Sequence, residues 1–431
     1  MKPNKLTTWI MIAMVLGVVV GYACHTLAPD AKAAKEIADY FSIVTDVFLR
    51  LIKMIVAPLV LSTLIAGIAT MGDTSAVGRI GFKALGWFIT ASLVSLMLGM
   101  LFVNLLQPGH AMNLPLPEVG AATNLKTSSL NLKDFITHVF PKSVFDALAQ
   151  NEILQILVFS IFFGFAIASF KGKVGRHLIE PIEDLVQVML RVTDYVMRAA
   201  PFGVFAAVAA AITVQGIGVL FTYGKFIGGF YLGLLVLWVV LIGAGWLFLG
   251  GRVFTLLKLI REPTILAFST ASSEAAYPKT MEQMEKFGVP DKITGFVLPL
   301  GYSFNLDGSM MYQAFAALFI AQAYNIDMSF SQQLTMLLVL MITSKGIAGV
   351  PRASIVVVAA TLPMFNLPEA GLLLIMGIDQ FLDMGRTATN VVGNSIATAV
   401  VAKWEGELQP TRGADEAGML EQAPSLRAPA V

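Results

Sequence analysis

Charged residues, cysteines and histidines are scarce in this chain of 431 residues. Only 13% of the residues are charged, 56% are hydrophobic, and the mean hydropathy is +0.76. So little charge excludes a water-soluble globular protein of this length and indicates an integral membrane protein. The formal net charge of +1 leaves no basic excess that would suggest nucleic-acid binding.

Cys24 is the only cysteine, which excludes an internal disulfide and a cysteine-based metal cluster. The four histidines lie near the ends of apolar segments or in loops, and none has a His-Glu-x-x-His spacing. They are His25, His110, His138 and His177. We therefore expect neither an intramembrane enzyme nor a cofactor.

Several apolar segments before residue 251 are long enough to span a bilayer, which takes about 20 residues. They cover approximately residues 8–28, 41–71, 80–106, 135–170, 182–212 and 219–250. The first exceeds the roughly 7–15 apolar residues of a signal sequence, so we expect a retained helix. Basic residues fall at alternate ends of successive segments, which predicts a cytoplasmic N-terminus by the positive-inside rule.

Two later segments have half-length apolar arms around a polar tip. The first covers about residues 255–289, with its tip at Ser269–Ala276 and a return arm after Pro278; the second covers about 330–366, with its tip at Thr343–Ser354. Paired segments of this kind predict re-entrant hairpins that line a transporter's binding site, because non-helical backbone at membrane depth must be buried or line water. Two kinked amphipathic surface helices are the alternative.

Between the hairpins, a spanning segment at about residues 293–324 is interrupted at Gly301–Ser309. On a regular helix Asn305 and Asp307, two residues apart, would point to opposite sides. Local unwinding would instead let backbone carbonyls and the carboxylate converge, and such oxygens suit a hard cation such as sodium. In a soluble protein the same Asp-Gly pair would be a simple turn.

The last long apolar segment, about residues 372–403, carries a polar stripe. At about 100° per residue, one helix face collects Asp379, Asp383, Arg386, Thr387, Asn390 and Asn394. A charged residue at the centre of a membrane helix costs about 2.5–3.5 kcal/mol, so these charges must pair with each other, with water or with a ligand. We therefore expect this helix to face a cavity.

The middle of the stripe suits a small molecule with two carboxylates and one amino group. The Arg386 guanidinium can bind a carboxylate through two parallel hydrogen bonds. Asp383 can pair with an ammonium group, and the Asn390 amide can donate to a second carboxylate. Together they predict an acidic amino acid as the ligand. An ion pair between Asp383 and Arg386 that serves only packing is the alternative.

Four motifs, in this order, resemble the dicarboxylate/amino acid:cation symporter family, the glutamate transporters. They are Ser272-Ser273 with Pro278, Asn305-Leu306-Asp307-Gly308, the run from Ser344 to Pro351, and the run from Asp383 to Asn390. The resemblance extends to about Glu407. It implies an all-α integral membrane protein with eight transmembrane helices, two re-entrant hairpins and inverted repeats. It also implies a homotrimer in the cell (inner) membrane.

The resemblance further implies an elevator built from residues 1–406. Helices within about 8–71 and 135–212 would form a trimerisation scaffold. The helix at about 80–106 and residues 219–406 would form a transport domain that moves across the membrane as a rigid body. Both termini would be cytoplasmic, and the composition of residues 407–431 predicts a disordered tail.

Carried over position by position, the motifs assign a substrate site, a cation site and two gate tips. Asp383 would bind the amino group of the substrate, Arg386 would bind its side-chain carboxylate, and Asn390 would bind its main-chain carboxylate. The other substrate residues would be Ser272, Ser273, Ser309, Val350 and Thr387. The cation residues would be Ser92, Gly301, Asn305, Asp307, Ser344, Asn390 and Asn394. The tip residues would be Glu274, Lys345, Gly349, Pro351 and Arg352, with Glu274 pairing with Lys345 or Arg352 across the closed tips; solvated side chains are the alternative.

Two departures from the sodium-coupled archaeal pattern leave the coupling ion open. Asn394 stands where that pattern has an aspartate, and Ala91-Ser92 replaces a Thr-Ser pair, with Thr90 displaced by one residue. Weaker sodium ligands favour H+, with Na+ as the alternative. Candidate proton carriers are Glu274, Asp307, Asp379 and Asp383, because a buried carboxylate can hold a proton near neutral pH.

The function that these residues indicate is symport of glutamate or aspartate with H+ and/or Na+. The main alternative is a C4-dicarboxylate such as succinate, fumarate or malate, whose second carboxylate would meet Asp383 at a Coulombic cost. A neutral amino acid would leave Arg386 buried and unpaired. A channel would not explain two gate-like hairpins.

Overall fold

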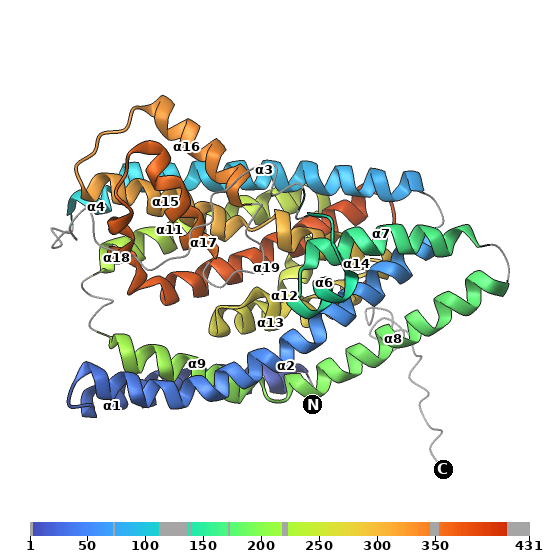
Figure 1. The fold of residues 1–431 in the computed structure, drawn as a ribbon, viewed down its shortest axis with the longest axis horizontal. Coiled ribbons are helices and arrows are strands. Elements are labelled where there is room, and N and C mark those ends of the chain that lie inside the picture. The colour runs from blue at the N-terminus through green and yellow to red at the C-terminus, as the bar shows by residue number, and fades with distance from the viewer. Residues whose placement is uncertain are drawn as a thin grey trace, which may run out of the picture.

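The structure is a computed structural model, and it describes residues 3–71, 74–111, 137, 139–170, 173–217, 223–344 and 353–411. These residues form helices joined by loops (Figure 1). Four of the helices are long and apolar enough to span a membrane: Thr8–Leu27, Ala31–Ala69, Ser75–His110 and Gly224–Leu249. The pair His177–Met197 and Ala200–Gln215, bent by 51°, adds a fifth span if it is counted as one. The chain is an integral membrane protein.

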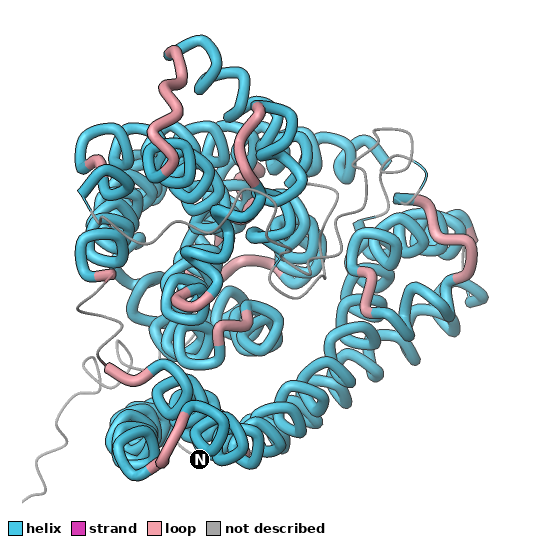
Figure 2. The backbone as a smooth tube through the Cα atoms, turned by 60° about the vertical axis from the view of Figure 1, so that its left-hand side comes forward, coloured by secondary structure: helices cyan, strands magenta, loops and turns pink. Residues whose placement is uncertain are grey.

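The N-terminal helices and α6–α9 form one group, which lies along one side of the molecule (Figures 1 and 2). In this group α2 packs against α7, α8 and α9, and α1 packs against α9. A Cβ at Gly17 would lie 2.8 Å from Phe205 O, and one at Gly21 2.7 Å from Ala209 O, so these glycines let two backbones touch. The helices are α1 (Pro3–Leu27), α2 (Ala31–Met71), α6 (Val144–Gln150), α7 (Ile153–Ser169), α8 (Lys173–Met197) and α9 (Ala200–Gln215).

The second group is built around α15 and α19. Every residue of α15 from Asp307 to Ala321 is buried, and α19 packs against α3, α11, α12, α13, α14 and α15. The group consists of α3 (Thr74–Leu106), α4 (Pro108–Ala111), α11 (Gly224–Leu249), α12 (Arg252–Thr270), α13 (Ser273–Phe287), α14 (Asp291–Phe304), α15 (Asp307–Ala323), α16 (Phe330–Thr343), α17 (Ala353–Thr361), η2 (Leu362–Phe365), η3 (Glu369–Gly371), α18 (Leu372–Met376) and α19 (Asp379–Trp404).

Three segments that the sequence predicts as single helices are broken. Within 135–170, α6 ends at Asn151, whose left-handed backbone (φ 56°) an asparagine tolerates well. Within 182–212, α8 and α9 meet at a bend, and a proline in the first turn of α9 favours a new helix start there. Within 372–403, the short α18 precedes α19, which begins at Asp379.

The arms of both expected hairpins are helical and pack against each other, α12 on α13 and α16 on α17. The first tip is Ala271–Ser272, where Ala271 is left-handed (φ 48°). Its return arm begins at Ser273, earlier than the sequence predicts, and Pro278 lies inside that helix. Residues 345–352 of the second tip lie outside the described residues.

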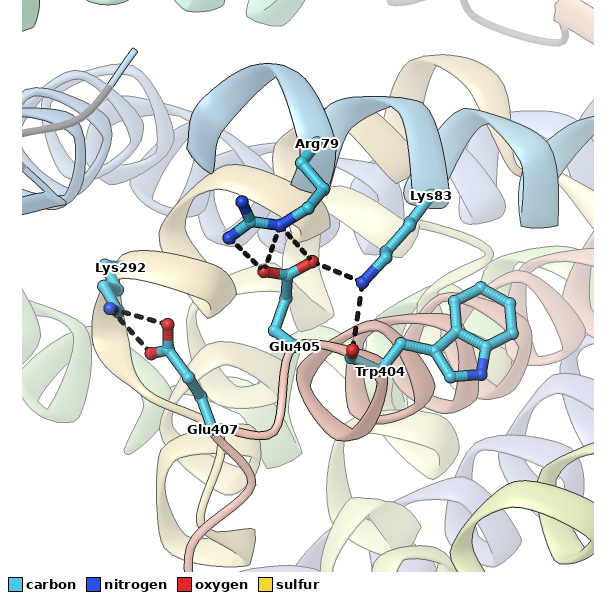
Figure 3. A network of polar contacts seen from close by, with 6 residues as sticks. All are labelled: Arg79, Lys83, Lys292, Trp404, Glu405 and Glu407. Carbon is cyan, nitrogen blue, oxygen red and sulfur yellow. Dashed lines mark hydrogen bonds and ion pairs between the residues drawn. The ribbon is translucent and has the colours of Figure 1, made fainter. Parts of the chain in front are cut away.

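Residues 405–411 cross the ends of several helices (Figure 3). Glu405 accepts hydrogen bonds from Arg79 at 2.8 Å and from Lys83 at 2.7 Å, and Glu407 lies 2.6 Å from Lys292. Burial raises the pKa of the Glu405 carboxyl, but the bonds from Arg79 and Lys83 outweigh it, so this pKa lies below its usual range. Glu407, Gln409 and Thr411 also contact the helices, whereas the sequence predicts that a disordered tail begins at residue 407. Residues 412–431 lie outside the described residues.

Candidate substrate and cation site

The polar site begins at the break between α14 and α15. Asn305 and Leu306 leave the helical conformation, with φ, ψ of −121°, 65° and −101°, 65°. Asn305 Nδ2 donates to Asp307 Oδ2 at 3.2 Å, and both residues are fully buried. The predicted unwinding is confirmed, and it brings together two side chains that a regular helix would separate.

α19 lies directly against this break. Asn390 Oδ1 accepts from Gly308 N at 2.9 Å, and Asn390 Nδ2 donates to Ser309 Oγ at 3.2 Å. Glycines permit the approach, because a Cβ at Gly308 would lie 2.4 Å from Arg386 O and one at Gly393 would lie 2.0 Å from Asp307 Oδ2. The polar stripe of α19 therefore faces the unwound step, whereas the sequence predicts only that it faces a cavity.

Oxygen atoms of several expected cation ligands gather here. A Cβ at Gly301 would lie 2.2 Å from Asn394 Oδ1, which places Asn394 beside the α14 backbone. Asn305 Oδ1 and both side-chain amide atoms of Asn394 are buried and have no hydrogen-bond partner among the described residues. Buried polar atoms normally have one. Together with the Asp307 carboxylate, these atoms could hold a small cation or a proton.

The other two expected cation residues, Ser92 and Ser344, lie on α3 and at the end of α16, two helices that pack against α15. Ser92 is fully buried on α3, which packs against α15 and α19, whereas Thr90 is exposed and donates to Gly86 O. The threonine displaced by one residue therefore faces away. The Ser344 hydroxyl lies 2.9 Å from Met341 O and 3.5 Å from the sulfur of Met310, the residue after Ser309.

Arg386 is the most strongly paired charge of the site. Its side chain is 1% exposed; Nη1 lies 2.9 Å from Asp379 Oδ1 and Nη2 2.8 Å from Asp383 Oδ1. The guanidinium also lies 4.0 Å from the centre of the Tyr312 ring. Asp379 is 1% exposed and Asp383 26%, so the Asp383 side of the pair is the accessible one. Thr387 Oγ1 donates to Asp383 Oδ1 at 3.3 Å.

Sequence reasoning missed two contacts of Arg386. The sequence places Asp379 on the polar stripe and makes it a candidate proton carrier, but it does not single out the pair with Arg386, seven residues or two helical turns away on the same face. The sequence does not assign Tyr312 to the site. No sequence pattern could place it, because it reaches Arg386 from another helix.

The tip of the first hairpin leads into α13, which packs against α19. The Ser272 hydroxyl accepts from Ala275 N at 3.2 Å and caps α13, and the Ser273 carbonyl accepts from Tyr302 OH at 3.0 Å. The first turn of α13 begins at this tip, and α13 packs against α19. The N–H groups of such a turn favour anions.

Glu274 has a neighbour that the sequence does not predict. Its Oε2 lies 3.9 Å from Nζ of Lys53 on α2, in the other helix group. Lys345 and Arg352, the expected partners, lie outside the described residues, as do Gly349, Val350 and Pro351. Those assignments stay predictions.

Comparisons with known proteins agree with the geometry. The sequence profile described as the sodium:dicarboxylate symporter family matches residues 6–404. The chain is 40% identical to a proton/sodium-glutamate symport protein of Geobacillus stearothermophilus, covering 98% of this chain and 100% of that one. It is 40% identical to a proton/glutamate-aspartate symporter of Escherichia coli (93% of each chain) and 41% identical to a C4-dicarboxylate transport protein of Albidiferax ferrireducens (95% and 90%). The chain belongs to the sodium:dicarboxylate symporter family, and is a transporter.

Proposed function

We propose that this protein is a secondary active symporter that takes up glutamate or aspartate. The observation that carries the proposal is the buried Arg386, paired with Asp379 and with the more accessible Asp383, one turn from Asn390. A ligand that carries both a carboxylate and an ammonium group can bind by exchanging partners with the ion pair between Asp383 and Arg386. Its carboxylate replaces Asp383 as the partner of Arg386, while its ammonium group pairs with the freed carboxylate of Asp383. Asp379 stays on Arg386, so no charge is left alone.

The same geometry argues against a C4-dicarboxylate, although several relatives carry that name. Succinate would displace Asp383 from Arg386 and offer it no cation in return. Like charges at close range in a buried site are costly. Asp383 is therefore the residue that selects for an amino group.

An Asp383→Asn variant tests this choice. It removes a charged hydrogen bond to the ammonium, worth about 1.5–3 kcal/mol, so we expect glutamate affinity to fall by about 10- to 100-fold. Competition by succinate against labelled glutamate should stay equal or strengthen, because the repulsive charge is gone. Both are measured in proteoliposomes. Unchanged glutamate affinity together with lost succinate binding would reverse the assignment.

The coupling ion is H+, Na+ or both, and we place it at the break between α14 and α15. The support is a buried Asp307 carboxylate beside neutral oxygens of Asn305 and Asn394. The relatives are named for both ions. The Asn394 amide supplies no charge, so the cluster offers a cation a single carboxylate.

We further propose an elevator with eight spanning helices and two re-entrant hairpins. The α1, α2 and α6–α9 group would be the scaffold of a homotrimer, and the α3 and α11–α19 group the moving part, with both termini in the cytoplasm of an inner membrane. The support is an apolar cavity of about 260 Å³ between α1 and α9 on one side and α12 and α19 on the other, lined by residues that include Met14, Val208, Phe268 and Met384. Elsewhere the two groups are in contact, chiefly where α2 packs against α13 and α14.

The contact between Lys53 and Glu274 allows a test of the elevator. Because Cys24 is the only cysteine, a Cys24→Ser background permits a Lys53→Cys, Glu274→Cys pair that a short bifunctional thiol reagent can bridge. A sliding domain must separate these positions, so the bridge should stop uptake almost completely, and cleaving the linker should restore it. Each single cysteine variant, treated alike, is the control. Full uptake by the bridged protein would rule out movement between the groups.

A further inference from the structure

We propose that Tyr231 of α11 is a positioning residue that holds the substrate-binding turn of α19 in place. The inference rests on the proposed function of Asp383 and Arg386. It adds that α11, which contributes no substrate ligand, sets the affinity of the site. The argument follows from the contacts between one face of α11 and two walls of the site.

The first contact is between Tyr231 and the backbone of α19. Tyr231 OH donates to Phe381 O at 2.6 Å. The tyrosine ring approaches so closely that a Cβ at Gly385 would lie 3.0 Å from Tyr231 Cε1 and 2.8 Å from Leu234 Cδ1. Gly385 thus leaves room for the ring on the turn that carries Asp383 and precedes Arg386.

A second hydrogen bond lies about two turns further along α19, at Thr389. Trp238 Nε1 donates to Thr389 Oγ1 at 2.9 Å, and Thr389 Oγ1 donates to Gly385 O at 2.8 Å. Tyr231 and Trp238 are seven residues apart, two turns along one face of α11. The two bonds therefore hold the segment with Asp383 and Arg386 from both ends.

The residues held by α11 lie opposite the substrate stripe. Phe381, Gly385 and Thr389 recur every four residues, so they form one line on α19, and Asp383 and Asn390 lie about half a turn away from it. A change in the packing of α11 against this line of residues therefore shifts the charged face of α19. The carbonyls of α19 already accept hydrogen bonds from amides of the same helix. The additional side-chain bonds to Phe381 O and Gly385 O are therefore not needed to form the helix.

The neighbour of Tyr231 supports the other wall of the site. The Phe230 ring packs edge-to-face on Tyr312 at 5.7 Å, and Tyr312 lies under the Arg386 guanidinium. Adjacent residues of α11 thus back both the helix that carries Arg386 and the ring that contacts it. The charged groups of the ligand therefore bind to side chains whose spacing is already fixed. Binding then does not have to order these side chains.

A Tyr231→Phe variant removes the hydroxyl and keeps the ring. Losing one hydrogen bond of ordinary strength corresponds to about a three- to tenfold weaker affinity. We expect KM for glutamate uptake in proteoliposomes to rise by that factor, with the maximal rate changed less than about twofold. Trp238→Phe should shift KM in the same direction. The matched control is Tyr223→Phe, at the start of the same helix, with KM unchanged.

The split between KM and maximal rate separates positioning from mere packing. A packing role would lower the melting temperature of the unliganded protein and the maximal rate and leave KM alone, and that result would overturn the proposal, as would an unchanged KM in Tyr231→Phe. Wild-type protein is assayed first with labelled glutamate, aspartate and succinate. If only succinate is accumulated, the proposed substrate fails, and the same KM comparison is then made with succinate.

Discussion

An Arg386→Ala variant is expected to lose glutamate binding almost completely. The guanidinium is buried and is paired with Asp379 and Asp383. Removing one partner of a buried, hydrogen-bonded charge pair between two binding partners costs about 2–5 kcal/mol, or roughly 30- to 4,000-fold in affinity. The variant also leaves two carboxylates close together without a cation. Isothermal titration of purified protein with glutamate measures the loss.

Arg386→Lys separates charge from geometry in this experiment. The ammonium keeps the positive charge between the two aspartates but cannot form the two parallel hydrogen bonds of a guanidinium. We expect it to restore the thermal stability of the unliganded protein and to recover only part of the affinity. An Arg386→Ala protein that is folded and binds glutamate within about tenfold of the wild type would show that the substrate carboxylate is held elsewhere.

Asp307→Asn is expected to abolish cation-driven accumulation. Asp307 is fully buried and is the carboxylate of the cluster at the helix break. At about 4 Å and an effective dielectric constant of 20, a carboxylate attracts a cation by about 4 kcal/mol, or close to 1,000-fold in affinity. Asparagine fills almost the same volume, so the fold should survive. The measurement is uptake as a function of the Na+ and H+ gradients.

The matched control for this variant is Asp291→Asn. Asp291 is an exposed aspartate in the first turn of α14, the helix whose other end leads into the break. We expect it to accumulate substrate normally. If Asp307→Asn also accumulates substrate with the wild-type dependence on both gradients, the coupling ion does not bind at the break.

Much of the site could be predicted because polar residues inside apolar spans are costly and so carry information. The break at Asn305 and the stripe of α19 both followed from residues that a lipid-facing helix would not contain. Helix spacing then placed Asp383, Arg386 and Asn390 on one face. The structure confirms both the break and the shared face.

Other features depend on contacts between distant segments, which local patterns do not encode. Tyr231 and Tyr312 look like ordinary membrane tyrosines until α11 and α15 pack beside α19. The composition of residues 407–431 predicts a disordered tail, yet Glu407 forms an ion pair with Lys292, and Glu405 just before it forms ion pairs with Arg79 and Lys83. The apolar composition of residues 182–212 suits one straight helix as well as two helices joined by a bend. It therefore does not predict the bend between α8 and α9.

The central claim is uptake of an acidic amino acid driven by a cation gradient. It is tested most directly with purified protein in liposomes, given labelled glutamate, aspartate or succinate under a Na+ gradient alone or an H+ gradient alone. The account predicts accumulation of glutamate or aspartate above equilibrium under at least one gradient, and its collapse when an ionophore removes that gradient. Accumulation of succinate without either amino acid, or mere equilibration of all three, would contradict it.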